Sequence, residues 1–381
     1  MSAGAGRPIV VTAGGSGGHL FPAVACAREL ARRGRRVVLV CDGRGARFTP
    51  DDIERRLIRA GSPSGPLPAR LRGFWRLGLG FAESLLLLRS LRPAAVASFG
   101  SYASVPAALA AELTGVPVLV HEQNALLGRA NRLIARRAAR VALTFARTAR
   151  VEGVVPPERR VVTGNPLRPE VAALAGAPYA PPEPGGPLRA LVMGGSQGAR
   201  VFSDLLPAAL PLLPEDMRRR LRLVQQCRPE DLERVRAAYD AAGIEAELSA
   251  FFADAPARMA AAHLIVCRSG ATTVTELMAL GRPSLLAPLP QATEGDQRAN
   301  AVVLAEAGAA RLLEDADLTP EGFARRLDEA LGDPARLAGM AAAAAALARP
   351  GAAGALADAI GALLEGRSAA VAPAATVGDL P

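Results

Sequence analysis

Residues 8–33 read PIVVTAGGSGGHLFPAVACARELARR and join three kinds of segment in one order. The apolar run at residues 8–13 predicts a buried strand, and the amphipathic run at residues 22–33 predicts a helix with Pro22 in its first turn. The glycine-rich loop between them lets the chain turn sharply where the strand ends. This order of strand, glycine loop and helix is typical of the start of a doubly wound α/β domain.

The same alternation continues along the chain and then begins a second time. Short apolar runs predict first-half strands at residues 36–41, 94–99, 117–121, 141–145 and 160–163. Proline and glycine crowd residues 175–187, which we predict to be a linker. Beyond it, strands are predicted at residues 188–193, 221–225, 247–252, 264–267 and 284–287, and helices at residues 200–213, 231–242, 272–279 and 297–307. We therefore predict two doubly wound parallel-sheet domains facing a cleft, where the ligands of such folds bind.

Length and composition are those of an ordinary globular protein. The 381 residues exceed what one core usually supports, and half of them are hydrophobic, which excludes wholesale disorder. No apolar run approaches the ~20 residues that cross a bilayer, and no secretion signal is recognisable at residues 1–7. The net charge of +9 favours anionic partners, although coding bias in a GC-rich genome also explains why arginine replaces every lysine. The four cysteines and three histidines are scattered, so neither disulfides nor a zinc site are predicted, and Cys26, Cys41 and Cys267 are expected in the core.

Glycine-rich motifs follow three of the predicted strands. GGSGGH at residues 14–19 exposes backbone amides that suit phosphate, and His19 at its mouth suits a general base; alternatively the loop is a tight turn without a ligand. GGSQGAR at residues 194–200 holds the equivalent place in the second half. CRSGATTVTE at residues 267–276 ends a strand and begins a helix, where Glu276 either accepts both hydroxyls of a ribose or serves the helix dipole.

Three polar motifs complete the set. HEQN at residues 121–124 is expected to turn four polar side chains toward the cleft, and DQRAN at residues 296–300 suits sugar hydroxyls. GNPLR at residues 164–168 ends in an arginine that can pair with a diphosphate. The six motifs occur in the order and spacing of the MurG family, the UDP-GlcNAc-dependent transferases that make lipid II in peptidoglycan synthesis. The sequence resembles that family over residues 8–350.

The resemblance implies a GT-B fold, in which two Rossmann-like domains face a deep interdomain cleft. Residues 1–167 would form the acceptor-binding, membrane-facing domain, and a helix at about 350–366 would pack back on it. Residues 168–349 would form the domain that binds UDP-GlcNAc. The Ala/Pro/Gly/Ser-rich end, residues 367–381, is predicted to be disordered.

The resemblance also implies roles for particular residues. Glu276 would bind the ribose, the backbone of Phe252 would read the uracil edge, and Gln297 would read the GlcNAc hydroxyls. Asn124 would reach the sugar from the other domain, and His19 would be the general base. The residues implied for the diphosphates are Ser196, Ala271, Thr272, Thr273, Val274 and Thr275, with Arg168 nearby, and Ser16, Gly17 and Gly18, which would bind the acceptor's diphosphate or complete the donor site.

The implied reaction is an inverting glycosyl transfer. The muramyl 4-hydroxyl of lipid I would attack the anomeric carbon of UDP-GlcNAc, and UDP would leave from the opposite face. Helix N-termini and Arg168 would neutralise the departing diphosphate. Because no clear D-x-D motif is present, neither a metal nor another cofactor is predicted.

The acceptor's polyprenyl chain implies a peripheral protein on the cytoplasmic side of the membrane, in contact with the anionic inner leaflet. Residues 67–91 mix arginines with aromatic and aliphatic side chains, so we predict membrane contact for residues 74–81 and burial for residues 85–88. The alternative is a loop followed by an ordinary buried helix. The arginine-rich residues 129–150 are predicted to be a solvated helix face, and no nucleic-acid partner is expected.

Two rival functions remain open at this stage. Another GT-B enzyme that glycosylates a lipid or natural product would have a similar donor pocket and differ in GGSGGH and HEQN. A non-catalytic nucleotide-sugar-binding subunit would be expected to lose His19, Gln297 or Glu276, and all three are present.

Overall fold

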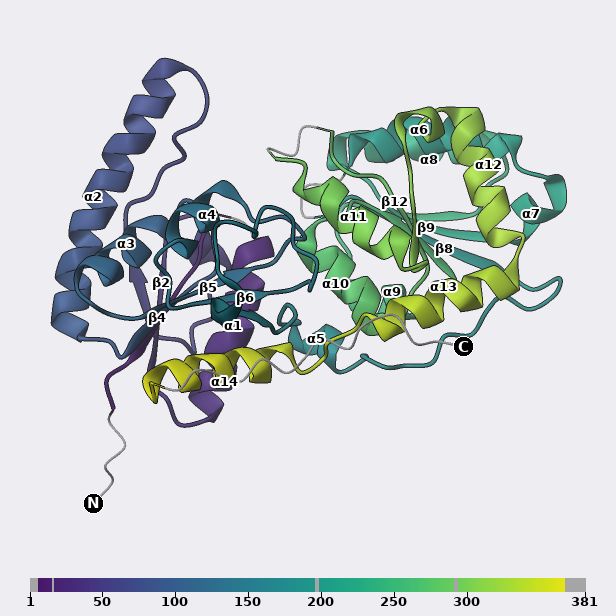
Figure 1. The fold of residues 1–381 in the computed structure, drawn as a ribbon. Helices are drawn as coiled ribbons and strands as arrows, with labels where there is room; N and C mark the ends of the chain where they lie inside the picture. Colours follow the sequence, from purple (N-terminus) through teal and green to yellow (C-terminus); the bar gives the residue numbers. More distant parts are fainter. Residues whose placement is uncertain (1–5, 16, 196–198, 291–293, 367–381) are drawn as a thin grey trace. The chain divides into compact units, whose positions relative to one another are not determined.

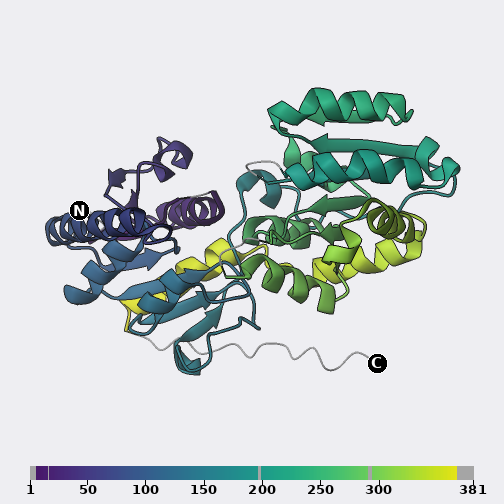
Figure 2. The same cartoon turned by 90° about the horizontal axis from the view of Figure 1, so that it is seen from above.

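The structure is a computed structural model that describes residues 6–15, 17–195, 199–290 and 294–366. The chain divides into two compact units, one running to Arg168 and resuming at Arg349, the other comprising Pro169–Ala348. Each unit contains one sheet flanked by helices (Figures 1 and 2). Ser16, Ser196 and the predicted tail lie outside the described residues.

The first unit is built on a parallel sheet with the strand order β3-β2-β1-β4-β5-β6-β7. Its strands are β1 (Ile9–Thr12), β2 (Val37–Cys41), β3 (Arg55–Leu57), β4 (Ala95–Ser98), β5 (Val118–Glu122), β6 (Arg140–Leu143) and β7 (Arg160–Val162). β1, β2, β4, β5 and β6 are buried at every position, as expected for parallel strands with helices on both faces. The edge strand β3 was not predicted, because its side chains are exposed and leave no apolar run.

The principal helices of this unit are α1 (Gly17–Arg32), α2 (Leu67–Leu91), α3 (Val105–Leu113), α4 (Arg129–Ala135) and α14 (Ala352–Leu364). α1 begins five residues before the predicted start, so Pro22 lies inside the helix instead of in its first turn. The missing N–H of Pro22 removes only the hydrogen bond to the carbonyl of Gly18. The early start places His19 within the first helical turn.

α2 is one continuous helix, and its two ends have different surroundings. In its second half Leu88 is buried, as predicted, whereas Leu86 is exposed. Phe81, which the sequence assigned to the membrane-facing part, packs instead against the core. The helix packs along α3, and Figure 1 shows its N-terminal end extending beyond α3.

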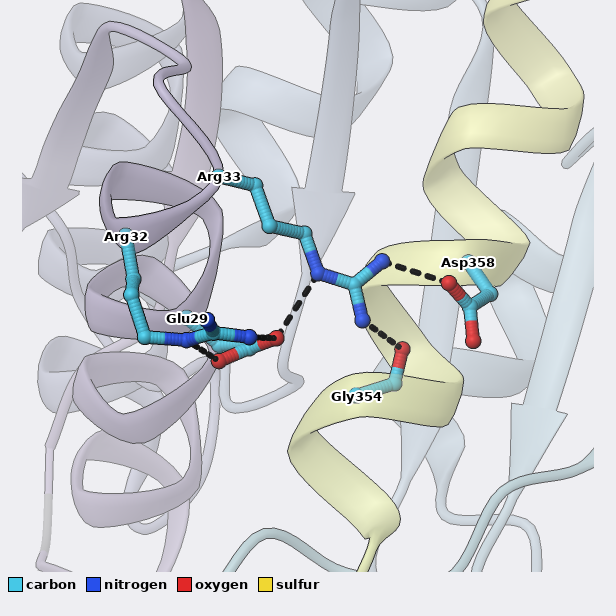
Figure 3. A network of polar contacts seen from close by, with 5 residues as sticks. All are labelled: Glu29, Arg32, Arg33, Gly354 and Asp358. Atoms are coloured by element: carbon cyan, nitrogen blue, oxygen red, sulfur yellow. Dashed lines mark hydrogen bonds and ion pairs between the residues drawn. The ribbon is translucent and has the colours of Figure 1, made fainter.

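α14 packs against α1 in the first unit. Leu356 and Ile360 are completely buried in the core between α1 and the sheet. A polar network also joins the two helices: Arg33 bonds Asp358, the carbonyl of Gly354 and the carboxylate of Glu29 (Figure 3). The apolar contacts are the stronger of the two, because the Asp358 side chain is 71% exposed and exposed ion pairs contribute little.

Replacing Ile360 by alanine is therefore expected to destabilise the protein by about 2–5 kcal/mol, the range for emptying a packed aliphatic site. Asp358→Ala on the same helix is expected to cost less than about 1 kcal/mol. Urea unfolding of both variants measures the difference. A larger loss for Asp358→Ala would mean that the polar network, and not the buried face, holds α14.

The second unit repeats the pattern with the strand order β10-β9-β8-β11-β12-β13, all parallel. The strands are β8 (Leu188–Met193), β9 (Leu221–Gln226), β10 (Ala246–Ser249), β11 (Leu264–Cys267), β12 (Ser284–Leu286) and β13 (Ala310–Leu312). The helices are α5 (Pro169–Ala172), α6 (Arg200–Ala209), α7 (Glu215–Arg220), α8 (Leu232–Ala241), α9 (Ala255–Ala261), α10 (Ala271–Leu280), α11 (Asp296–Glu306), α12 (Pro320–Leu331) and α13 (Pro334–Ala346). The prediction of two doubly wound parallel sheets is confirmed, and Cys26, Cys41 and Cys267 are buried as expected, as is Cys227.

The proline-rich segment 175–187 is part of the second unit, which corrects the prediction of a linker. The Tyr179 hydroxyl donates to the carbonyl of His263 at 2.9 Å, and the Gly176 amide donates to Ala279 at 3.1 Å. The guanidinium of Arg282 lies 5.5 Å from the Tyr179 ring centroid. Proline and glycine indicate that a segment is irregular, but they do not indicate what it packs against. The contacts of Tyr179 hold this segment on the second unit.

Candidate active site

Both sheets reverse their strand order beside their first strand, between β1 and β4 in one unit and between β8 and β11 in the other. At such a point neighbouring loops diverge, and a crevice opens at the carboxyl edge of the strands. The predicted site residues gather at these two edges. His19, Gly17 and Gly18 follow β1, and residues 271–276 follow β11.

The first glycine loop is shaped by close contacts at the β1/β4 edge. A Cβ on Gly14 would lie 2.3 Å from the Cβ of Ala103, and Gly15 has a φ of +83°, so both positions require glycine. The Asp42 carboxylate at the end of β2 accepts N–H bonds from Gly15 at 3.2 Å and Gly45 at 2.9 Å. This anchor was not predicted, because Asp42 belongs to none of the motifs.

His19 is half-buried at the start of α1. Its Nδ1 lies 3.0 Å from the carbonyl oxygen of Phe99 and 3.0 Å from Oε1 of Gln123. A carbonyl oxygen only accepts hydrogen bonds, so Nδ1 carries the hydrogen and Nε2 keeps its lone pair. No hydrogen-bond partner of Nε2 is found within the described part of the chain, and a proton acceptor is therefore available at this edge.

The HEQN motif departs from the expectation that all four side chains face a cleft. His121, Glu122 and Gln123 are buried, and only Asn124 is half-exposed. The Glu122 carboxylate accepts hydrogen bonds from the backbone and side-chain nitrogens of Asn124, at 3.0 and 3.2 Å. It also accepts from the backbone of Gly128 and the side chain of Asn131. Glu122 thus positions Asn124, a role that strand-end polarity alone did not reveal.

Acidification is expected to destabilise the protein through His121. Burial lowers the pKa of His121 to about 4, whereas an unfolded histidine titrates near ~6.5. The stabilising neutral form is fully present above the unfolded pKa, and its contribution is lost as the pH falls toward the folded value. At pH 5 the loss is about 2 kcal/mol. Urea unfolding at pH 7 and pH 5 should show a pH dependence smaller by that amount in His121→Phe; equal dependence in both proteins would contradict it.

The start of α10 is the clearest anion site of the second unit. The helix begins after Gly270, and the amide of Val274 already donates to the Gly270 carbonyl at 3.0 Å. Of the residues 271–275 implied for the diphosphate, only Ala271, Thr272 and Thr273 therefore have backbone amides without a helical acceptor. The Thr272 hydroxyl oxygen is buried and finds no hydrogen-bond partner among the described residues. Free amides, a helix N-terminus and an unused hydroxyl together suit a diphosphate.

Three further predicted donor-site residues lie in the second unit. Glu276 is 5% exposed in α10, within reach of the same helix end. Gln297 begins α11, where its carbonyl oxygen accepts from Ser269 Oγ at 2.8 Å and its Oε1 accepts from the Leu289 amide at 3.0 Å. The structure gives the Gln297 NH₂ group no partner among the described residues, so this group can donate to a ligand. Phe252 lies in the loop after β10.

Arg168 is the last residue of the first of the two segments that make up the first unit. Its guanidinium lies 5.7 Å from the ring centroid of Phe21, a cation–π distance. Phe21 is on α1, two residues beyond His19. The structure therefore brings Arg168 to the helix that carries the candidate base.

Across the described ranges, no group of three or more His, Cys, Asp or Glu side chains is placed to hold a metal ion. A D-x-D triplet does occur at residues 315–317, and it begins a 3-10 helix. There the Asp317 carboxylate accepts from the Glu314 amide at 3.1 Å and from Arg326 at 2.8 Å, so these aspartates serve local structure.

Comparisons with known proteins agree with this architecture. The glycosyltransferase family 28 N-terminal domain matches residues 9–143, and the family 28 C-terminal domain matches residues 189–356. A UDP-N-acetylglucosamine–N-acetylmuramyl-(pentapeptide) pyrophosphoryl-undecaprenol N-acetylglucosamine transferase of Rhodospirillum rubrum is 50% identical, with 94% of this chain and 92% of that protein covered. The transferase of the same name from Granulibacter bethesdensis is 45% identical, with 93% of each chain covered.

Solved structures give the same result. MurG of Acinetobacter baumannii superposes with a TM-score of 0.77 at 31% identity, covering 93% of this chain and 99% of that one. The kitacinnamycin glycosyltransferase is similar in fold, with a TM-score of 0.69 at 21% identity and coverage of 94% and 100%. The chain therefore belongs to glycosyltransferase family 28 and, within it, to the MurG family.

Proposed function

We propose that this protein transfers GlcNAc from UDP-GlcNAc to the muramyl 4-hydroxyl of lipid I, giving lipid II for peptidoglycan synthesis. The observation that carries the proposal is His19, whose Nδ1 is held by two acceptors while Nε2 keeps its lone pair. The near full-length similarity to transferases of this name supports the choice of substrates.

In the proposed reaction the 4-hydroxyl oxygen attacks the anomeric carbon of GlcNAc. Its proton passes to Nε2 of His19, and the bond from the anomeric carbon to the diphosphate oxygen breaks with its electron pair on UDP. Attack and departure on opposite faces invert the anomeric configuration. An imidazole suits the proton transfer because its ordinary pKa lies near neutral pH.

The second unit is assigned to the leaving group. The amides of Ala271, Thr272 and Thr273, together with the Thr272 hydroxyl, donate to the diphosphate as its charge develops. Glu276 accepts from the ribose hydroxyls, and the NH₂ group of Gln297 donates to a GlcNAc hydroxyl. The backbone of Phe252 is assigned to the uracil, although its carbonyl already accepts weakly from the Ala255 amide at 3.3 Å.

Radiolabel transfer from UDP-GlcNAc to a lipid I analogue tests the function directly. We expect labelled disaccharide product with and without a chelator of divalent cations, because helix dipoles and hydrogen-bond donors carry the charge stabilisation. The matched control is an acceptor whose muramyl 4-hydroxyl is replaced by hydrogen. Transfer to that control, or to an unrelated lipid glycoside in preference to lipid I, would indicate a different glycosyltransferase.

The N-terminal half of α2 is proposed as the membrane contact on the cytoplasmic face. Leu67, Leu71, Phe74 and Trp75 recur at helical spacing and are exposed, with Trp75 at 70%. Arginines lie among them at Arg70, Arg72 and Arg76, all exposed. No described helix of the chain is long and apolar enough to cross a membrane. An apolar stripe bordered by guanidinium groups favours docking on an anionic leaflet.

A cavity of about 590 Å³ lies between this helix and the end of β2, lined by Arg44, Arg59, Trp75, Arg76, Leu79 and Asp42 among others. Asp42 is also the residue that holds the first glycine loop. The cavity therefore reaches from α2 to Asp42, the residue that anchors the loop assigned to the acceptor's diphosphate. We assign the membrane-anchored acceptor to this side of the first unit.

Binding to vesicles that contain an anionic phospholipid is expected to weaken about 10–100-fold in Leu71→Ala, because a leucine side chain inserted in lipid contributes about 1.5–3 kcal/mol. Leu86→Ala is the matched control, since Leu86 is comparably exposed on the same helix (69% against 61%) but lies in its second half, beyond the proposed N-terminal contact. Binding should also fall as salt is added, because screening weakens the attraction between arginine and lipid headgroups. Equal losses in both variants would exclude a specific α2 face.

A further inference from the structure

We infer that Gln123 and His121 are positioning residues that keep the hydrogen of His19 on Nδ1, so that Nε2 is the proton acceptor. The inference rests on the proposed function for its catalytic meaning, but the hydrogen position itself is a property of the folded protein. Neither residue is assigned to contact either substrate. They act through a chain of hydrogen bonds that ends at His19.

This chain of hydrogen bonds begins at the backbone carbonyl of Gly164. Nε2 of His121 lies 2.9 Å from the carbonyl oxygen of Gly164, so this nitrogen must carry a hydrogen. His121 is completely buried, and burial lowers its pKa to about 4, which keeps the ring neutral. A neutral ring with hydrogen on Nε2 has a lone pair on Nδ1. His121 therefore presents an acceptor to its other neighbour.

That neighbour is the side-chain amide of Gln123. One end of the amide lies 3.0 Å from Nδ1 of His121, 3.0 Å from the carbonyl oxygen of Phe99 and 3.1 Å from the His121 carbonyl oxygen. All three are acceptors, so this end is the NH₂ group and the other end is the oxygen. A flipped amide would place its oxygen against three lone pairs. His121 thereby fixes the orientation of Gln123.

The oriented amide then acts on His19. Oε1 of Gln123 lies 3.0 Å from Nδ1 of His19, and the Phe99 carbonyl oxygen lies 3.0 Å from the same nitrogen. Two acceptors face Nδ1, so a tautomer with its lone pair there would be repelled by both. A neutral histidine in water prefers its hydrogen on Nε2, which is the nitrogen needed as the base. The buried hydrogen bonds reverse that preference and keep the hydrogen on Nδ1.

Imidazole ¹⁵N NMR tests the inference on the whole protein, because the chain contains only three histidines. In neutral-to-alkaline buffer we expect His19 with hydrogen on Nδ1 and His121 with hydrogen on Nε2. His263 is the internal reference: its Nδ1 accepts from the Arg189 amide at 3.2 Å, so its hydrogen also belongs on Nε2. A wild-type spectrum with the His19 hydrogen on Nε2 overturns the inference without any variant.

Two substitutions separate positioning from mere packing. Gln123→Leu leaves only the Phe99 carbonyl facing Nδ1, so it should raise the share of His19 with hydrogen on Nε2, lower kcat in proportion to the lost Nδ1 tautomer and leave the KM for UDP-GlcNAc unchanged. Gln123→Glu, protonated on the oxygen that faces the three acceptors, keeps an acceptor toward His19 and should restore both the Nδ1 tautomer and most of kcat. Urea unfolding of each variant confirms that the first unit is folded.

The outcomes also separate this inference from the proposed function. If His19 in Gln123→Leu keeps the same share of the Nδ1 tautomer as the wild type, the positioning role is wrong even when the wild-type protein makes lipid II. If the wild-type protein transfers no GlcNAc but shows the expected tautomers, the hydrogen-bond chain stands and the proposed function is wrong. A kcat loss that Gln123→Glu fails to restore, with the tautomer restored, would assign Gln123 a packing role.

Discussion

Replacing His19 by alanine is expected to lower kcat for GlcNAc transfer by about 10²–10⁴-fold, the usual contribution of a positioned general base. The methyl group of alanine cannot accept the proton of the attacking hydroxyl. His121 cannot replace His19 as the base, because it is buried and both its ring nitrogens are engaged. The KM for UDP-GlcNAc should change little. Steady-state assays of labelled product measure both parameters.

His263→Gln is the control for this experiment. His263 is buried in the second unit, against β8, and takes no part in the proposed reaction. Its kcat should remain near that of the wild type. Full turnover in His19→Ala would show that the base is another group, even with the transferase activity intact.

Glu276→Ala is expected to raise the KM for UDP-GlcNAc by about 10–100-fold, because hydrogen bonds to a charged group contribute ~1.5–3 kcal/mol and each ~1.4 kcal/mol is a factor of ten. The side chain is buried in the middle of α10, where solvent does not replace a lost ribose contact. The value of kcat should fall much less, since the ribose is bound in both the ground state and the transition state. Isothermal titration with UDP-GlcNAc and steady-state kinetics measure the two effects.

Two variants control for the loss of a buried side chain. Glu276→Gln keeps the shape and one acceptor oxygen, so its KM should fall between those of the wild type and the alanine variant. Glu233→Ala removes an exposed carboxylate from α8 in the same unit and should leave donor binding unchanged. Unaltered affinity in a folded Glu276→Ala protein would contradict the ribose role and leave Glu276 a structural residue.

Most of the fold was predictable from local patterns. Buried parallel strands are short apolar runs, and each predicted run became a strand, because covering helices make both faces of such a sheet apolar. The two missed strands, β3 and β13, have three residues each and lie at the sheet edges, where so short a strand gives no periodic signal. The start of α1 was misplaced because proline favours a first turn but is tolerated in the second.

The candidate site was predictable as a set of residue types and not as a set of contacts. The glycine loops, the imidazole of His19 and the carboxylate of Glu276 were identifiable because their chemistry follows from composition and from their place after a strand. The burial of three of the four HEQN side chains was not, since a polar residue at a strand end can face either solvent or a neighbouring loop.

Amino-acid order along this chain was sufficient for the class of fold, the family and the groups able to move a proton or hold a diphosphate. Those features depend on residue identity and on short-range periodicity. The folded protein alone established which nitrogen of His19 carries hydrogen, which amides of α10 stay free, and that residues 175–187 pack on the second unit. Each of these depends on atoms that only folding brings together: His19 meets Phe99 and Gln123 across 80 and 104 residues of chain, and no local pattern encodes such a contact.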